Sequence, residues 1–260
     1  LFTKNLFNKM KKDFISIIIP YHKKKIHFQD TINSIIKQTY TNYELVIIYD
    51  DQDKSELRHV KNVLNNVKGK KIRLIVNKKN IGAGLSRNKA IKYSNGKYIC
   101  FLDADDYWKK EKIETQINFM IEKNFKISHT SYDIINEENK FIRHRKAKTF
   151  TSYEDILTSC DIGLSTVILD KKIFSENIKF ANLKTKEDFV LWLFILKQNI
   201  VIGGLDQNLS FWRKTKNSLS SSTLQKLLDG FRVYHKYLEF SFVKSLYLLI
   251  CLGFNYLKKN

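Results

Sequence analysis

The sequence predicts an α/β fold in which a mostly parallel central sheet is covered by helices on both faces. Apolar runs rich in β-branched residues alternate with amphipathic segments along its 260 residues, the order expected of a parallel sheet with crossover helices. An apolar share of 43% is large enough to form a core. Polar residues follow the apolar runs, and ligands bind beyond the carboxyl ends of strands in such sheets.

Four apolar runs in the first 110 residues predict four strands. They are "FISIIIP", "YELVIIYDD", "KIRLIVN" and "KYICFLDADD". Nearly continuous runs of this kind are typical of parallel strands buried on both faces. Apolar residues spaced three and four apart predict the helices between them, the first with Asp30 as its N-cap and the last with Gly96 after its end.

The pattern is less regular beyond residue 111. "KISHTSYDIIN" and "STVILDKKIF" predict further strands, and "EDFVLWLFILKQ" predicts a helix that is buried nearly all round. "VIGGLDQNLSFWRKTKNSLS" predicts a strand that runs into a polar loop. The basic, aromatic and increasingly apolar residues 221–260 predict a C-terminal helical extension.

Polar clusters come at the ends of three predicted strands, and we expect them to face one ligand because parallel strands end at a common edge. The clusters are Pro20-Tyr21-His22, Asp50-Asp51 and Asp103-Asp105-Asp106. Like charges this close repel one another. A Mg²⁺ or Mn²⁺ ion held by Asp103 and Asp105 would remove that repulsion and would neutralise a diphosphate. The alternative for the two acids is a solvated turn.

The other clusters carry two interpretations each. An Asp50 or Asp51 carboxylate can accept a hydrogen bond from a nucleotide base or a ribose, or can cap the helix that begins near Lys54. Pro20-Tyr21-His22 offers a rigid turn and a ring that can stack on a base. The alternative for His22 is an ordinary surface or core histidine. Arg87 either contacts the ligand or pairs with an acid in the sheet.

Glu187 and Asp188 open the predicted buried helix. The positive end of a helix favours ionised carboxylates, and such a group can act as a general base that deprotonates a hydroxyl. Ordinary stabilisation of the helix dipole is the alternative. Arg213, followed by Lys214 and Lys216, can clamp a leaving diphosphate or form a solvated basic loop.

In these pieces the chain resembles the inverting family 2 nucleotide-sugar glycosyltransferases. The matching stretches occur in the family's order over residues 14–220: "ISIIIPYH", "QTYTNYELVIIYDD", "NIGAGLSRNKAI", "GKYICFLDADDYW", "KEDFVLW" and "FWRKTKNSLS". The resemblance implies a GT-A-type, Rossmann-like domain. We expect one domain with a nucleotide-sugar-binding half over 13–110 and an acceptor-binding half over 111–220. A tail over 1–12 precedes it, and the extension over 221–260 lies outside the matched stretches.

The resemblance also implies roles for single residues. Pro20, His22 and Asp51 would hold the base, Asp103 would lie near the ribose and the metal, and Asp105 would ligate the Mn²⁺ or Mg²⁺. Asp188, with Glu187 beside it, would deprotonate the acceptor hydroxyl. Two departures affect the base-binding end: His22-Lys23 stands where the family has Tyr or Phe followed by Asn, and "DDQD" replaces "DDGS".

The implied reaction transfers a sugar from a nucleoside diphosphate sugar, with UDP favoured, to a hydroxyl of a glycan or lipid-linked acceptor in bacterial surface polysaccharide or lipopolysaccharide synthesis. One alternative is a nucleotidyltransferase, although "PYHKKK" has no glycine for a triphosphate loop. The other is a basic nucleic-acid-binding module, which would place cations, not acids, on the exposed face. We therefore expect no nucleic-acid partner.

The charge and the tail bear on location. Lys and Arg number 46 against 26 Asp and Glu, a net +20, which attracts an anionic partner; compositional drift is the alternative. "SLYLLICLGF" is too short to cross a bilayer but can lie in an anionic membrane interface, or pack on the domain or a second subunit. Cys100, Cys160 and Cys251 are too far apart to suggest a disulfide framework. We expect a cytoplasmic protein, peripheral at the inner face of the membrane.

Overall fold

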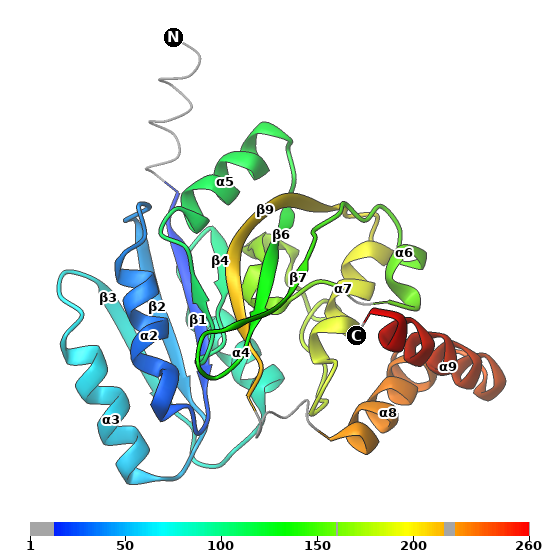
Figure 1. Ribbon diagram of the computed structural model, residues 1–260, viewed down its shortest axis with the longest axis horizontal. Coiled ribbons are helices and arrows are strands. Elements are labelled where there is room, and N and C mark those ends of the chain that lie inside the picture. The colour runs from blue at the N-terminus through cyan, green and yellow to red at the C-terminus, as the bar shows by residue number, and fades with distance from the viewer. Residues whose placement is uncertain (1–12, 160, 216–221, 260) are drawn as a thin grey trace.

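The computed structural model describes residues 13–159, 161–215 and 222–259. The predictions for segment 1–12, Cys160 and Lys216 lie outside the described residues. Within them one mixed sheet has the order β3-β2-β1-β4-β8-β6-β9-β5, with β7 paired to β6 (Figure 1). The strands are β1 Ile15–Tyr21, β2 Tyr43–Tyr49, β3 Lys71–Val76, β4 Tyr98–Phe101, β5 Tyr107–Trp108, β6 Ile127–Ile135, β7 Phe141–Arg145, β8 Ile168–Asp170 and β9 Ile202–Arg213.

The parallel half is the one that the apolar runs predict. Strand β1 pairs in parallel with β2 and with β4, and β2 pairs in parallel with β3. The second half mixes directions, since β8 is antiparallel to β4 and β6, whereas β9 runs parallel to β6. The helices are α2 Lys25–Ile36, α3 Lys54–Asn65, α4 Ala83–Tyr93, α5 Lys112–Glu122, α6 Glu154–Leu157, α7 Glu187–Lys197, α8 Thr223–Arg232, α9 Phe242–Lys259, the short η1 Leu164–Thr166 and η2 Lys171–Ile173, and the π-helix η4 Val233–Tyr237.

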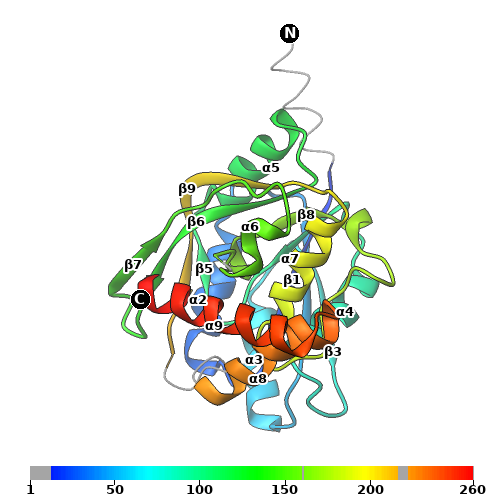
Figure 2. The ribbon, with the colours of Figure 1, turned by 90° about the vertical axis from the view of Figure 1, so that its right-hand side faces the viewer.

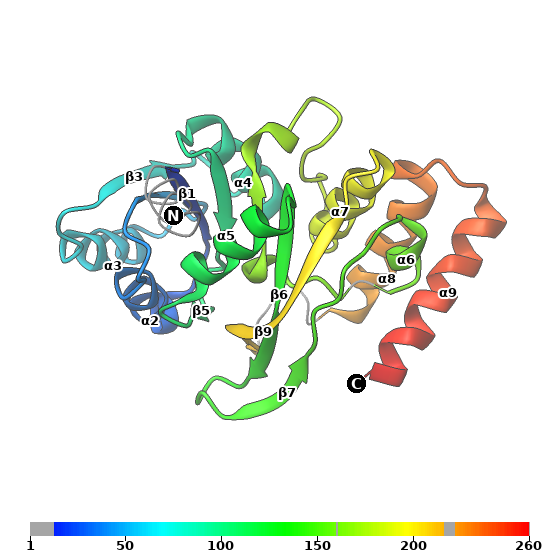
Figure 3. The ribbon, with the colours of Figure 1, turned by 90° about the horizontal axis from the view of Figure 1, so that it is seen from above.

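Side chains of the central strands alternate between two cores because successive residues of a strand point to opposite faces. In β1, Ile17 and Ile19 face the core that contains residues of α2, α3 and α5, whereas Ile18 faces the core that contains residues of α4 and α7. The prediction of helices on both faces is therefore confirmed (Figures 1 and 3).

The C-terminal extension packs beside α7 (Figures 2 and 3). Val233, Leu248 and Leu252 belong to the same core as Phe189, and the ring of Tyr234 meets the ring of Phe189 edge-on at 6.4 Å. The inner side of the extension is thus part of the core of the molecule. Among the described helices, none is long and apolar enough to cross a membrane.

Two predicted local details are wrong. Helix α2 begins at Lys25 after Lys24, so Asp30 lies inside the helix and is not its cap. Helix α4 ends at Tyr93, and Gly96 does not have a positive φ. Glycine is needed at 96 because a Cβ there would lie 2.4 Å from the backbone nitrogen of Ser16. The requirement is close packing of two chain segments, not a left-handed turn.

Candidate active site

The ends of β1, β2 and β4 bring the predicted polar clusters to one edge of the sheet. Tyr21 at the end of β1 is paired with Tyr49 of β2, and Ile18 is paired with Phe101 at the end of β4. Asp50-Asp51 therefore leave the sheet beside Pro20-Tyr21-His22, and Asp103-Asp105 follow one strand away. We call this edge the acidic rim.

Arg87 of α4 connects the acidic rim to the start of α7. Its guanidinium donates a 2.6 Å hydrogen bond to Asp103 Oδ1 and a 2.7 Å bond to Glu187 Oε1. The side chain is only 3% exposed, and the ring of Phe180 lies 5.5 Å from its guanidinium carbon. Of the two interpretations that the sequence left open, pairing with acids is the one observed, and it joins residues 84 positions apart in the sequence.

Glu187 and Asp188 are the first two residues of α7. Burial raises the pKa of the Glu187 carboxyl to about 7, even though Arg87 opposes that rise. Burial also raises the pKa of Asp188, again against the charge of Arg87. Asp188 Oδ1 accepts a 2.8 Å bond from the amide of Phe189. Among the residues that the structure describes, no basic side chain forms an ion pair with Asp188, so the two acids differ in their partners.

Asp105 also has a basic partner. Lys24 Nζ donates a 2.6 Å bond to its Oδ2. Burial raises the pKa of Asp105, and Lys24 opposes that rise. The electrostatic crowding that the sequence shows is thus relieved in part by protein cations, Lys24 at Asp105 and Arg87 at Asp103.

Asp106, which the sequence left without a role, is a buried structural acid. Its Oδ2 accepts a 2.5 Å bond from Ser165 Oγ, and its Oδ1 accepts a 2.8 Å bond from the amide of Arg213. Burial raises its pKa well above the ordinary value. Asp106 therefore fixes the end of β9 and the η1 turn against the segment that carries Asp103 and Asp105.

The Arg213 side chain differs from the predicted open clamp on a diphosphate. It is 2% exposed. Its Nε donates a 2.9 Å bond to the carbonyl of Asp105, and its Nη1 donates a 2.7 Å bond to Asn139 Oδ1. Its guanidinium is directed into the protein, where it supports the backbone of Asp105. The neighbouring Lys214 is exposed.

At the other end of the acidic rim, Asp50 has the structural role and Asp51 lies beside His22. Asp50 accepts bonds of 2.9 and 2.8 Å from the amides of Ile81 and Gly82. These two amides belong to the glycine-led turn before α4, so the Asp50 carboxylate fixes that turn. His22 Nδ1 lies 3.4 Å from Asp51 Oδ2, and the His22 side chain is 40% exposed.

Tyr21 does not face this edge. Its ring is fully buried, stacks on Tyr49 at 5.6 Å, and its hydroxyl donates to Glu56. The expectation that a ring from Pro20-Tyr21-His22 stacks on a base therefore cannot apply to Tyr21 in this arrangement, because the side chain lies in the core.

The second glycine of "NIGAGLSRN", Gly84, lies where α4 approaches the start of α7 and leaves no room for a side chain. A Cβ at Gly84 would lie 2.8 Å from the carbonyl oxygen of Ala181 and 3.0 Å from Glu187 Cγ. The absence of a side chain at Gly84 lets α4 approach the start of α7 closely enough for Arg87 to reach Glu187. Gly82 has a φ of 87°, which favours glycine.

The residues present fit a divalent cation only as partial ligands. Carboxylate oxygens of Asp103 and Asp105 suit Mg²⁺ or Mn²⁺. Arg87 and Lys24 each engage one oxygen of this pair. Within the described part of the chain, no three or more His, Cys, Asp or Glu side chains are grouped to hold a metal. Phosphate oxygens of a bound nucleotide would have to complete the set.

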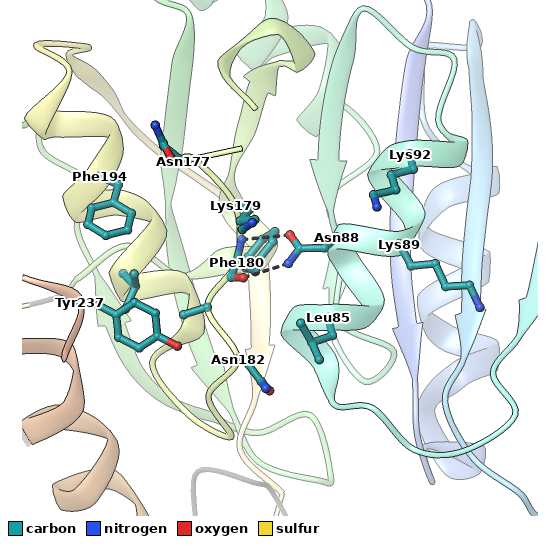
Figure 4. Close-up of a pocket in the computed structure, with 12 residues that line it drawn as sticks. Leu85, Asn88, Lys89, Lys92, Asn177, Lys179, Phe180, Asn182, Phe194 and Tyr237 are labelled. Atoms are coloured by element: carbon teal, nitrogen blue, oxygen red, sulfur yellow. Dashed lines mark hydrogen bonds between the residues drawn. The ribbon is translucent and has the colours of Figure 1, made fainter. Parts of the chain in front are cut away.

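A cavity of about 530 Å³ lies between α4 and α7 (Figure 4). None of the predicted site residues lines it. Its lining includes Phe180, whose backbone exchanges two hydrogen bonds with the Asn88 side chain, of 2.9 and 3.0 Å (Figure 4). These bonds fix Phe180 beneath Arg87.

The sheet and its acidic rim define a GT-A-type fold, and comparisons with known proteins agree. The model of the family "Glycosyl transferase family 2" matches residues 16–178, more than half of the chain. The chain belongs to glycosyl transferase family 2.

Two relatives match nearly the full chain. The Escherichia coli "UDP-Glc:alpha-D-GlcNAc-diphosphoundecaprenol beta-1,3-glucosyltransferase WfgD" is 32% identical over 90% of this chain and 90% of its own length. The Bacillus subtilis "Putative teichuronic acid biosynthesis glycosyltransferase TuaG" is 29% identical over 96% of this chain and 98% of its own. The solved structure of residues 1–349 of S. aureus TarS with UDP-GlcNAc has a TM-score of 0.70 at 19% identity, over 92% of this chain and 71% of that one. The GT-A-type prediction is confirmed.

Proposed function

We propose that this protein is an inverting glycosyltransferase that moves a sugar from a nucleoside diphosphate sugar, with UDP favoured, to a hydroxyl of a lipid-linked or glycan acceptor in bacterial surface polysaccharide or lipopolysaccharide synthesis. The observation that carries the proposal is the ion-pair bridge from Asp103 through Arg87 to Glu187. It joins the end of a central strand, where a donor binds in this fold class, to two acids at a helix start.

The donor lies along the acidic rim. His22 and Asp51, with the turn at Pro20, hold the base, and Asp103 faces the ribose and diphosphate. Tyr21 and Arg213 do not contact the donor in this proposal, since their side chains are buried. Arg213 acts indirectly, by supporting the backbone of Asp105 from within. When bound, Mg²⁺ or Mn²⁺ at Asp103 and Asp105 would neutralise charge on the departing diphosphate.

Asp188 is the base. Glu187 is hydrogen bonded to Arg87, whereas Asp188 has no ion-pair partner among the described residues, so Asp188 is the acid better suited to accept a proton. Its raised pKa increases its basicity toward a hydroxyl. Asp188 takes the acceptor's proton, the hydroxyl oxygen bonds to the anomeric carbon, and the bond to the diphosphate breaks on the opposite face. The configuration at that carbon inverts.

The choice of substrates draws on the relatives. The name of WfgD specifies a UDP-sugar and a lipid diphosphate acceptor, that of TuaG specifies teichuronic acid biosynthesis, and TarS was solved with UDP-GlcNAc. We therefore favour UDP and a lipid-linked acceptor for this chain.

A transfer screen tests this function. UDP-, GDP- and CMP-sugars are incubated with a polyprenyl-diphosphate-linked sugar acceptor, with and without Mn²⁺, and products are examined by NMR for the configuration of the new linkage. A product whose linkage is inverted relative to the donor is expected. Release of pyrophosphate from a nucleoside triphosphate, or thermal stabilisation by RNA alone, would instead support a nucleotidyltransferase or a nucleic-acid-binding module.

We also propose that α9 lies on an anionic membrane surface. One side of the helix is buried at Ser245, Leu248 and Leu252. The opposite side exposes a second apolar stripe with helical spacing, which we call the outer stripe: Val243, Leu246, Tyr247, Ile250, Phe254 and Leu257. Exposed contiguous apolar side chains mark interaction surfaces, and the chain's net charge of +20 favours an anionic lipid surface.

Vesicle sedimentation tests the outer stripe. Replacing Val243, Leu246 and Ile250 by Ser should release the protein from phosphatidylglycerol vesicles. Replacing Phe141 and Ile142, which are exposed on β7 at 64% and 45%, serves as the matched control and should leave binding unchanged. Loss of a dimer in sedimentation analysis, with vesicle binding unaffected, would assign the stripe to a second copy instead.

A further inference from the structure

The start of α7 is fixed by a carboxylate from the C-terminal extension. Asp229 of α8 is fully buried, and its Oδ2 accepts a 3.0 Å bond from the amide of Thr185 and a 3.1 Å bond from Thr185 Oγ1. Thr185 is three residues before Asp188 and two before Glu187. A side chain outside the region matched by the family model thus holds the backbone directly before both acids.

Asp229 is itself held in place. Gln225 Nε2 donates a 2.8 Å bond to its Oδ2, and Arg232 Nη1 donates a 3.0 Å bond to its Oδ1. Burial by itself would raise its pKa, but the bonds from Gln225, Thr185 and Arg232 lower it overall. Asp229 is therefore ionised at neutral pH and accepts all four bonds.

The segment that Asp229 holds is strained. Lys186, between Thr185 and Glu187, has a φ of 62° and a ψ of 17°, in the left-handed region. Such a conformation is unfavourable in a residue other than glycine, and persists only where neighbouring contacts enforce it. A Cβ at Gly230 would lie 3.6 Å from Lys186 Cε and 2.8 Å from Leu249 Cδ1, so α8 also packs against the Lys186 side chain.

From these contacts we propose that Asp229 is a positioning residue for Glu187 and Asp188: through Thr185 it maintains the left-handed turn at Lys186 that sets where α7 begins. The inference rests on the proposed function, in which Asp188 is the base. The extension thereby contributes to catalysis through a named pair, Asp229–Thr185, in addition to its proposed contact with lipid.

Thr185→Val and Asp229→Asn test the pair in the full chain. Thr185→Val removes one hydrogen-bond donor and keeps the amide. It should lower kcat about tenfold with an unchanged KM for the donor, because the acids shift while the acidic rim does not. The acidic limb of the pH–rate profile should also move, since the burial that raises the pKa of Asp188 depends on where α7 begins. Thr185→Ser should restore kcat and the profile.

Leu224→Ala is the matched control, because Leu224 is exposed on the same helix and the change leaves all four bonds to Asp229 in place. It should keep the wild-type kcat. Unfolding in urea gives the folded fraction of each variant. If Asp229→Asn fails to fold, the result for Thr185→Val alone tests the Asp229–Thr185 pair. Wild-type kcat and pH profile in Thr185→Val would overturn the inference. If Thr185→Val is normal while Asp188→Asn is inactive, only this inference fails; activity in Asp188→Asn instead removes the base assignment.

Discussion

Arg87 bridges Asp103 and Glu187, with hydrogen bonds of 2.6 and 2.7 Å from its two terminal nitrogens. The bridge joins a strand end to a helix start across the sheet, and the guanidinium is almost completely buried. One residue thus fixes the distance between the two acidic parts of the site, and the predictions below depend on it.

Replacing Arg87 by Gln should abolish transfer and lower the free energy of unfolding by about 3 kcal/mol, because a buried acid is left without its partner. The loss should be smaller at pH 5 than at pH 8, because burial raises the pKa of Glu187 to about 7 and the protonated acid needs no counter-charge. Urea unfolding of both proteins at pH 5 and pH 8 measures this loss in the free energy of unfolding. Arg87→Lys keeps the charge but not the two-pronged geometry, so it should recover stability more than activity. An equal loss at both pH values would contradict the bridge.

The raised pKa of Glu187 gives stability a definite pH dependence. The folded-state pKa of about 7 exceeds the ordinary carboxyl value of 4.5, so its contribution is fully present below pH 4.5 and is lost as pH rises through 7. Relative to wild type, Glu187→Gln should therefore become progressively more stable between pH 4.5 and pH 8. Chemical denaturation across this range is the measurement, and a difference that does not change with pH would contradict the assignment.

Metal binding should depend on the nucleotide. The described chain has no group of three or more candidate side chains for a metal, so Mn²⁺ alone should bind weakly and Mn²⁺ with UDP tightly in calorimetry. Asp105→Ala should remove the Mn²⁺ dependence of UDP binding. Lys24→Met, which frees the Asp105 carboxylate from its partner, should strengthen Mn²⁺ binding. Tight Mn²⁺ binding without nucleotide would show that other ligands exist.

Asp50 should matter for folding more than for chemistry. Asp50→Ala leaves the amides of Ile81 and Gly82 without their acceptor, which should cost about 2 kcal/mol of stability. Gly82→Ala should cost about 1 kcal/mol because of its positive φ. Both variants should keep the donor KM within about threefold of wild type under conditions where they are folded. A large rise in donor KM with intact stability would instead place Asp50 in contact with the nucleotide.

The parallel half of the fold could be predicted from the sequence, because buried parallel strands are nearly continuous apolar runs and here each ends in polar residues. The residue at which α2 begins could not be predicted from the sequence. Its first turn, from Lys25, carries neither a capping side chain nor acidic residues, so the apolar spacing from Ile32 onward was the clearest signal.

The positions of the candidate acids at strand and helix ends could be predicted, but the side chains that pair with them could not. Asp103, Asp105, Glu187 and Asp188 stand at recognisable strand and helix ends. Lys24 lies within a run of three lysines, "KKK", that gives no sign which of them meets Asp105. Asp229 lies on a separate helix, 44 positions from Thr185, and only the folded chain brings them together.

Single-turnover transfer by Asp188→Asn tests the central claim most directly, with the donor dissociation constant measured on the same preparation and Glu187→Gln as the companion variant. Asp188→Asn should bind donor within about twofold of wild type and transfer sugar about 10³-fold more slowly, the loss typical of a missing general base. Transfer at a near-normal rate would contradict the account, because the proton would then be taken by a group other than Asp188.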